Sequence, residues 1–358
     1  MKQIFGHADA MSTLKDVFQS GRIHHAWIFS GPSGVGKCTL AEQFASVILD
    51  PKRSIDLLGT SHCTGSNEEN LMSSGTHPDL HIIRRTLAAH SSISALRERK
   101  QMNIPLDLLR ELIIGGRTSD GKIHESAAYH TASLSEGKVF IIDEADRMDI
   151  PGQNAMLKTL EEPPSSTYFI LVTDRPERLI PTIWSRCQHI ALSPLGDDEM
   201  KLWLDHTDFD LSSGPLQNVI DFSEGSPGMA TRYIEHDVDS WCSTMRPIMD
   251  GLDCGAWTAS ASEIMVDLID NWAQIVLEKN SKSSKSAASQ EGAEMVFRIM
   301  TRHLREKVRS ANDPVVLSAG CDLIDRVAEA ESQILSGLNL KHILDALTSE
   351  WASQSVSL

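Results

Sequence analysis

A glycine-rich segment near the N-terminus has the residue types and the spacing of a phosphate-binding loop. Residues 31–39 read GPSGVGKCT and lie between an expected strand and an expected helix, the context that such a loop requires. Gly31, Gly34 and Gly36 let backbone N–H groups converge on phosphate oxygens, and the N-terminus of the following helix adds a favourable dipole. Lys37 would reach the β- and γ-phosphates, so the segment predicts a nucleotide site rather than a ligand-free turn.

Cys38 departs from this pattern, because the motif has Ser or Thr at that position to coordinate Mg²⁺. A thiol is a poor ligand for such a hard ion. Thr39 carries a hydroxyl group, but it lies about 100° further around the helix, and we expect it to point away from the metal. We include both residues in the nucleotide site and expect ATP hydrolysis to be weak or absent.

A second segment, KVFIIDEAD at residues 138–146, is an apolar run that ends in carboxylates. Asp143 could hold the Mg²⁺ of a bound nucleotide, and Glu144 could polarise an attacking water as a general base. In isolation, two acids at the N-terminus of a helix, where they meet its dipole, would be the better interpretation. The phosphate loop upstream favours the functional interpretation, so ATP and Mg²⁺ are the expected cofactors.

The elements that would position these segments follow from the hydrophobic pattern. Short apolar runs alternate with amphipathic helical patterns through residues 1–193. A run that is apolar at every position is typical of a parallel sheet covered by helices on both faces. We therefore predict an α/β P-loop nucleotide fold for residues 1–193. Its expected strands are residues 26–29, 80–83, 139–142, 168–172 and 189–192.

The remainder of the chain has a different pattern. No convincing strand follows Pro194, and apolar residues recur at helical spacing. We expect a small helical lid domain at residues 194–240 and an all-helical C-terminal domain at residues 241–358. The polar, basic stretch at residues 279–286 is expected to be a flexible loop.

The composition limits the classes of protein. The 358 residues include 33 Lys and Arg against 49 Asp and Glu, a net charge of −16, so the chain is not expected to coat nucleic acid by itself. No apolar run is long enough to cross a membrane, and the first residues lack the features of a secretory signal. The six cysteines have no paired spacing and are interpreted as reduced thiols, which predicts a cytoplasmic chain without a membrane partner.

Several motifs resemble those of the subunits of bacterial DNA polymerase III clamp loaders, which are AAA+ proteins. The similarity spans about residues 4–235 and implies an AAA+ fold, with the all-helical tail as an oligomerisation (collar) domain. It also implies a hetero-oligomer with gamma/tau and delta subunits, which reaches the sliding clamp and primer–template DNA through the complex. The motifs are GRIHHA at residues 21–26, DEADRM at 143–148, LKTLEEPP at 157–164 and SRC at 185–187.

The resemblance also implies roles for single residues. Arg186 matches the arginine finger that is offered in trans to ATP on a neighbouring subunit, where a planar guanidinium donates to phosphate oxygens in a way that Lys cannot. A surface Arg that pairs with carboxylates is the simpler alternative. Thr173 or Asp174, just past an expected strand, lies where ATPases of the family carry a polar nucleotide sensor.

Two features depart from the active ATPases of the family. Gly228 stands where they carry a nucleotide-sensing Arg, and Arg232, one helical turn later, is a weak substitute. The family often has a four-cysteine zinc module after the phosphate loop, but that interval contains only Cys63. One thiol with His62 or His77 does not supply four ligands, so we predict no zinc.

Three functional hypotheses follow. The first is a clamp-loader subunit that acts mainly as a structural partner and supplies Arg186 in trans, which Cys38 and Gly228 favour. The second is a gamma/tau-like motor subunit that hydrolyses ATP, which the phosphate loop and the acids at 143–144 support. The third is an unrelated P-loop helicase, but the acidic charge and the lack of a second helicase motif count against it.

Overall fold

The computed structural model describes residues 2–98, 103–209, 216–279, 285–335 and 339–354. The chain forms two compact units, Met1–Thr231 and Arg232–Leu358, and each is described by itself.

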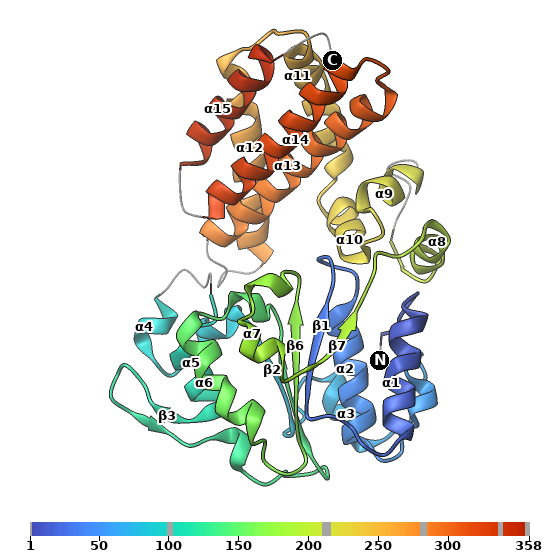
Figure 1. The fold of residues 1–358 in the computed structure, drawn as a ribbon, viewed down its shortest axis with the longest axis vertical. Coiled ribbons are helices and arrows are strands. Elements are labelled where there is room, and N and C mark those ends of the chain that lie inside the picture. Colours follow the sequence, from blue (N-terminus) through green and yellow to red (C-terminus); the bar gives the residue numbers. More distant parts are fainter. Residues whose placement is uncertain (1, 99–102, 210–215, 280–284, 336–338, 355–358) are drawn as a thin grey trace. The chain divides into compact units, whose positions relative to one another are not determined.

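A parallel five-stranded sheet is the centre of the first unit (Figure 1). The strand order is β2-β5-β6-β1-β7, and all neighbouring strands are parallel. Each strand that the sequence predicted is confirmed to within one residue at either end. The strands are β1 (Ala26–Ser30), β2 (Leu80–Ile83), β5 (Lys138–Ile142), β6 (Thr167–Thr173) and β7 (Gln188–Ala191).

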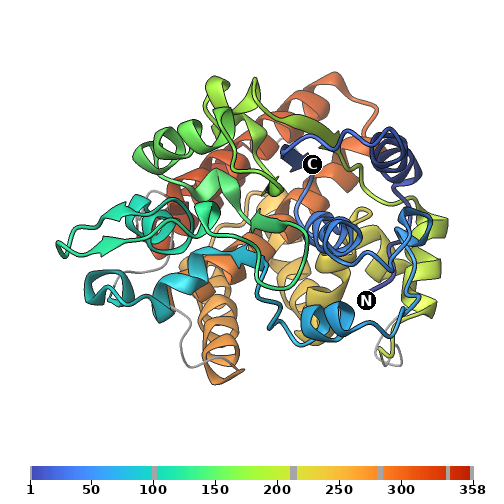
Figure 2. The same ribbon diagram turned by 90° about the horizontal axis from the view of Figure 1, so that it is seen from below.

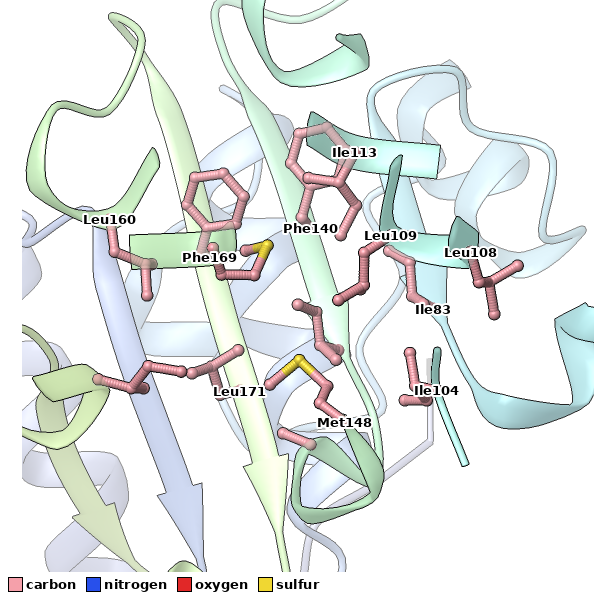
Figure 3. Packing of buried hydrophobic residues seen from close by; sticks show 14 of the residues in the cluster. Ile83, Ile104, Leu108, Leu109, Ile113, Phe140, Met148, Leu160, Phe169 and Leu171 are labelled. Atoms are coloured by element: carbon pink, nitrogen blue, oxygen red, sulfur yellow. The ribbon is translucent and has the colours of Figure 1, made fainter. Parts of the chain in front are cut away.

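Both faces of this sheet are covered, because successive side chains of each strand point to opposite sides. One face packs against α6 (Ile150–Glu161) and α5 (Leu106–Leu109), and its core includes Phe140 and Phe169 (Figure 3). The other face packs against α1 (Ala8–Gln19) and α2 (Lys37–Leu49), and its core includes Trp27. The expected fold class, a parallel sheet with helices on both faces, is confirmed for this unit.

Short elements complete the first unit. A small antiparallel hairpin of β3 (Gly116–Arg117) and β4 (Ile123–His124), which the sequence did not predict, extends away from the sheet at the left of Figure 2. The remaining α-helices are α3 (Asn67–Ser73), α4 (Ser94–Arg97), α7 (Pro181–Trp184), α8 (Asp197–Asp205), α9 (Leu216–Ser223) and α10 (Pro227–Glu235), which continues into the second unit. The short 3₁₀ helices are η1 (Ile55–Leu57), η2 (Arg85–His90), η4 (Ala127–Tyr129), η5 (Ala145–Arg147) and η6 (Pro176–Arg178), and η3 (Arg110–Ile114) is a π-helical segment.

The described residues of the second unit form helices joined by short connections, as expected. The helices are α11 (Val238–Asp253), α12 (Ala259–Lys279), α13 (Lys285–Ser310), α14 (Pro314–Leu335) and α15 (Leu340–Ser353). The loop predicted at residues 279–286 is wrong at both ends, because Lys279 belongs to α12 and residues 285–286 belong to α13. Residues 280–284 lie outside the described residues. Among the described helices, none combines the length and the apolar character needed to span a membrane.

A buried carboxylate joins three helices of the second unit. Asp253, at the end of α11, is 1% exposed and accepts hydrogen bonds from His303 Nε2 at 2.7 Å and Trp351 Nε1 at 3.0 Å. Lys307 Nζ lies 3.0 Å from the same carboxylate. Since these partners come from α13 and α15, one acid connects the C-terminal end of α11 to both helices.

Candidate functional site

The phosphate loop follows β1 and leads directly into α2. Lys37 begins that helix, and Gly36 caps it in the left-handed conformation with a φ of 105°. Gly34 also has a positive φ, 76°, and a Cβ at that position would lie 2.5 Å from Ser226 Oγ. Both positions require glycine, so the backbone has the strand–loop–helix geometry of a phosphate site.

The side chain of Lys37 is folded back onto its own loop. Its Nζ donates hydrogen bonds to the carbonyl oxygens of Gly31 at 2.8 Å and Pro32 at 2.6 Å. Asp174 Oδ1 lies 2.6 Å from the same nitrogen, and the lysine is 5% exposed. A phosphate group would therefore have to replace the Asp174 carboxylate to reach Lys37.

The carboxyl ends of β2 and β5 bring two consecutive arginines to the two acids. The backbone N–H of Asp143 donates to the Ile83 carbonyl at 2.9 Å, so the residues after both strands are neighbours. Arg84 Nε donates to Asp143 Oδ2 at 3.0 Å. Arg85 Nε donates to the two carboxylate oxygens of Glu144 at 2.9 and 3.1 Å. The candidate metal ligand Asp143 and the candidate base Glu144 thus each have an arginine partner within the chain.

Arg84 also reaches Cys38 across the site. Its Nη2 donates to Cys38 Sγ at 3.3 Å and lies 3.5 Å from Glu42 Oε1. Burial raises the pKa of the Cys38 thiol to about 12, and the negative charges of Asp143 and Glu42 act in the same direction. The thiol is therefore protonated at neutral pH and offers no anionic ligand.

Glu144 is constrained as a candidate general base. Its φ of 56° is left-handed, which is uncommon for a residue other than glycine. Burial raises its pKa and the nearby Asp143 adds to this, whereas Arg85 opposes the shift. Because Arg85 binds both carboxylate oxygens, a water molecule would have to compete with a guanidinium for Glu144.

The remaining candidates of the nucleotide site point in different directions. Thr173 Oγ1 donates to Asp146 Oδ1 at 3.0 Å, whereas its neighbour Asp174 is the residue that reaches Lys37. Thr39 lines a cavity of about 490 Å³. The other residues that line this cavity are Lys2, Glu42, Gln43, Met72, Ser73, Gly75, His77, Leu80 and Ile82.

The start of α10 packs directly onto the tip of the phosphate loop. The Gly228 backbone N–H donates to the Gly34 carbonyl at 2.9 Å, and Ser226 Oγ donates to the Ser33 carbonyl at 2.8 Å. A Cβ on Gly228 would lie 2.8 Å from Gly34 Cα. An Arg at position 228 would therefore require this contact to open, and the candidate substitute Arg232 lies further along α10.

Arg186 lies two residues after the end of α7 and is held by contacts within its own unit. Its Nη1 donates to the Thr182 carbonyl at 2.7 Å, and its Nη2 lies 2.5 Å from Glu161 Oε1. The arginine side chain is 32% exposed and the glutamate 48%. Glu161 belongs to the LKTLEEPP motif, so two of the motifs noted in the sequence meet in this ion pair.

The cysteine-poor interval after the phosphate loop does not gather further metal ligands in the described residues. Cys63 is exposed, and neither it nor His77 belongs to a group of three potential ligands there. The group that is found, Asp250, Asp253 and His303, lies in the second unit and contains the lysine-paired carboxylate described above. The absence of zinc remains a prediction.

Sequence reasoning missed the two arginines and Glu42. The sequence signal that could have revealed the two arginines is their position. They directly follow one predicted strand, just as the acids at 143–144 directly follow another. Since parallel strands end at the same sheet edge, two cations after one strand and two anions after a second strand could have been expected to pair.

The fold and the site define a P-loop protein of the α/β class whose nucleotide machinery is altered at several positions. A family model described as "DNA polymerase III, delta subunit" matches residues 6–196, just over half of the 358 residues. The chain therefore belongs to the DNA polymerase III delta-subunit family.

Individual relatives carry two subunit names. The "DNA polymerase III subunit delta'" of Escherichia coli (strain K12) is 31% identical over 220 residues, 62% of this chain and 57% of that protein. The delta' subunit of Pseudomonas aeruginosa is 30% identical over 208 residues, 58% of this chain and 55% of that protein. The "DNA polymerase III subunit gamma" of Buchnera aphidicola subsp. Schizaphis graminum is 31% identical over 243 residues, 66% of this chain and 57% of that protein. The matches thus span little more than half of each relative.

A gamma subunit-related protein from Thermotoga maritima has a TM-score of 0.47 at 15% identity and covers 97% of this chain and 100% of its own.

Proposed function

We propose that this chain is the delta-prime subunit of a DNA polymerase III clamp loader and helps load the sliding clamp onto primed DNA. Its partners would be the gamma/tau and delta subunits, in the cytoplasm where replication takes place. Membership of the family and the two delta' relatives support the class of complex. The observation that favours the delta-prime subunit over a motor subunit is the contact of Gly228 with Gly34. Gly228 stands where the family's active ATPases carry a nucleotide-sensing Arg, and this close packing leaves no space for that side chain.

We expect the isolated chain to bind Mg-ATP weakly or not at all and to hydrolyse it negligibly. Phosphate would have to displace Asp174 from Lys37, and the start of α10 holds the tip of the loop. The thiol of Cys38 replaces the hydroxyl ligand of the motif, and Glu144 is paired with Arg85. The site residues Gly31, Gly34, Gly36, Lys37, Cys38, Thr39, Asp143, Glu144 and Thr173 would then serve mainly as structure.

Arg186 is the proposed chemical contribution of the chain. It is partly exposed just after α7, and its ion pair with Glu161 is of the kind that contributes little to stability. The γ-phosphate of ATP on a neighbouring subunit would offer the guanidinium a more strongly charged partner than one carboxylate. Glu161 would then position Arg186 until the neighbour presents its nucleotide.

The helical parts would organise the complex. We propose that residues 194–240 form a lid in which the start of α10 packs on the phosphate loop. Residues 241–358 would form the collar through which the subunits assemble. The helices α11 to α15 support this assignment, since a helical domain of this size can present long faces to partner helices.

Reconstitution tests the proposal. The chain is mixed with the gamma/tau and delta subunits of the same organism, assembly is followed by size-exclusion chromatography, and DNA-stimulated ATPase is measured. Stable assembly, with ATPase that depends on Arg186, would support the delta-prime assignment. Turnover of ATP by the isolated chain at about 1 per second or faster, a typical enzyme rate, would instead favour the motor alternative.

A further inference from the structure

Arg84 contacts both positions from which a P-loop ATPase holds its magnesium ion. Its Nη2 lies 3.3 Å from Cys38 Sγ, at the position of the motif's hydroxyl ligand. Its Nε lies 3.0 Å from Asp143 Oδ2, at the position of the acidic ligand. One guanidinium therefore connects α2 to the end of β5, as a metal ion bound to both residues would.

These residues do not fit Mg²⁺. The ion requires oxygen ligands at about 2.0–2.1 Å in near-octahedral geometry, and Cys38 offers a sulfur atom. The Asp143 oxygen already accepts a charged hydrogen bond from Arg84. A dication would also lie next to a guanidinium that is held in place by Glu42, and like charges repel strongly at such short distances.

The neighbouring Arg85 also places a cation of the chain beside an acid of the site. Arg85 binds both carboxylate oxygens of Glu144, so each of the two acids after β5 is paired with a cation from the chain itself. The arginines follow β2 directly, at the sheet edge where the Asp143 N–H donates to the Ile83 carbonyl, so the strand pairing places them beside the acids. The charge balance of the acids is therefore supplied by the chain itself.

We propose that Arg84 is a built-in cation that takes the place of Mg²⁺, so that a phosphate ligand at this loop meets a guanidinium instead of a metal ion. We rely on the proposed function only in treating residues 31–39 as a phosphate site. Nucleotide binding by the parent chain, however weak, is then independent of divalent metal. Removing Arg84 and supplying a hydroxyl at position 38 re-creates a site that uses Mg²⁺.

The test measures ATP binding to the full chain by calorimetry, once with MgCl₂ and once with EDTA at matched ionic strength. Two double variants are compared with the parent. Arg84→Ala with Cys38→Ser removes the built-in cation and supplies the oxygen ligand. Arg117→Ala with Cys38→Ser is the charge-matched control, because Arg117 lies in the exposed β3 strand and has no part in this network. Melting temperatures verify that each variant is folded.

We expect Mg²⁺ to strengthen ATP binding by at least about tenfold, or ~1.4 kcal/mol, in the Arg84 variant only. No metal dependence in that folded variant would overturn the proposal, as would binding by the parent or the control that rises tenfold with Mg²⁺. Assembly with the clamp-loader subunits is a separate measurement, so a parent chain that assembles but needs Mg²⁺ for ATP would refute only the role of Arg84.

Discussion

Two clusters of carboxylates and cations, one in each compact unit, differ in burial and therefore in what they can do. At the nucleotide site, the side chains of Asp143 and Glu144 are 21% and 33% exposed, and each has one arginine partner. In the helical unit, Asp253 is 1% exposed and is bound by groups from two other helices. Carboxylates and cations thus form pairs that a competing partner can replace near solvent, and contacts that hold helices together in the interior of the helical unit.

The difference has a physical cause. Near solvent, water competes with every charged contact, so a ligand or a substitution can replace one partner at a cost of about 0–1 kcal/mol. In the interior, removal of one partner leaves the other charge buried and unpaired. Clusters of similar composition therefore differ in what a substitution costs, which is little in the exposed cluster and much in the buried one.

The largest expected effect is on the buried cluster. Asp253→Ala leaves Lys307 and His303 without their buried acceptor, and we expect a loss of about 3–5 kcal/mol in the free energy of unfolding. Urea unfolding followed by tryptophan fluorescence measures it, since Trp351 is a partner of the carboxylate.

Asp250→Ala is the matched control for that measurement, because Asp250 lies one turn earlier on α11 and is exposed. We expect a change within about 0.5 kcal/mol. Equal effects of the two substitutions would remove the distinction between the clusters.

The next effect concerns Arg186. Arg186→Ala should leave the melting temperature nearly unchanged, because the lost ion pair is partly exposed. It should depress the DNA-stimulated ATPase of the assembled complex several-fold, less than the ~10³–10⁵ reported for arginine fingers in GTPases, since one of several sites is affected. Arg186→Lys should rescue poorly, because an ammonium lacks the planar fork.

The exposed Arg178, just before α7, supplies the control for Arg186, and Arg178→Ala should keep full activity. If the alanine and lysine variants of Arg186 both load clamps at the parent rate, Arg186 is a surface ion pair and nothing more.

A smaller effect is expected from acid. Burial alone would raise the pKa of Asp253, but hydrogen bonds from His303, Lys307 and Trp351 outweigh it and hold the pKa below its ordinary value of 3.8. The charged carboxylate thus contributes stability above about pH 4, and this contribution is lost as the pH falls through the lower native pKa. Unfolding free energies between about pH 3 and 5 should fall more steeply in the parent than in Asp253→Asn.

The smallest effect should come from Cys38→Thr alone. The substitution supplies the missing hydroxyl but leaves Arg84 beside Asp143, and substitutions of residues in contact are not additive. We expect Mg²⁺ to improve ATP binding by less than about threefold, in contrast to the double variant without Arg84. A gain from Cys38→Thr as large as that of the double variant would show that the thiol alone impairs the site.

Much of the architecture could be predicted from local patterns. The five strands were predicted to within a residue at each end, because each is a short apolar run bounded by turn residues. The hairpin of β3 and β4 was missed, since its strands are two residues each and carry no periodicity. The polar stretch after residue 279 was assigned to a loop on composition, but Lys285 already begins a helix.

The candidate site was predictable only where its chemistry is local. The phosphate loop lies within nine consecutive residues, and the two acids directly follow a strand, so the sequence alone indicated both. The assignments of Arg186 and Thr173 came from the resemblance and remain predictions. In the structure, Arg186 pairs with Glu161, and Thr173 donates to Asp146. Each of these contacts joins two separate segments of the chain, so no local sequence pattern indicates it.

Hydrophobic periodicity determined the sheet and the helices that cover it, and a local glycine motif determined the phosphate loop. All of these depend on residues only a few positions apart in the chain. Tertiary structure alone decided that Arg84 lies between Cys38 and Asp143, since three chain segments meet at one sheet edge. It also decided that Gly228 packs on Gly34, where a single Cβ would clash. Short-range charge and shape complementarity between distant segments depends on their three-dimensional placement, which hydrophobic periodicity does not encode.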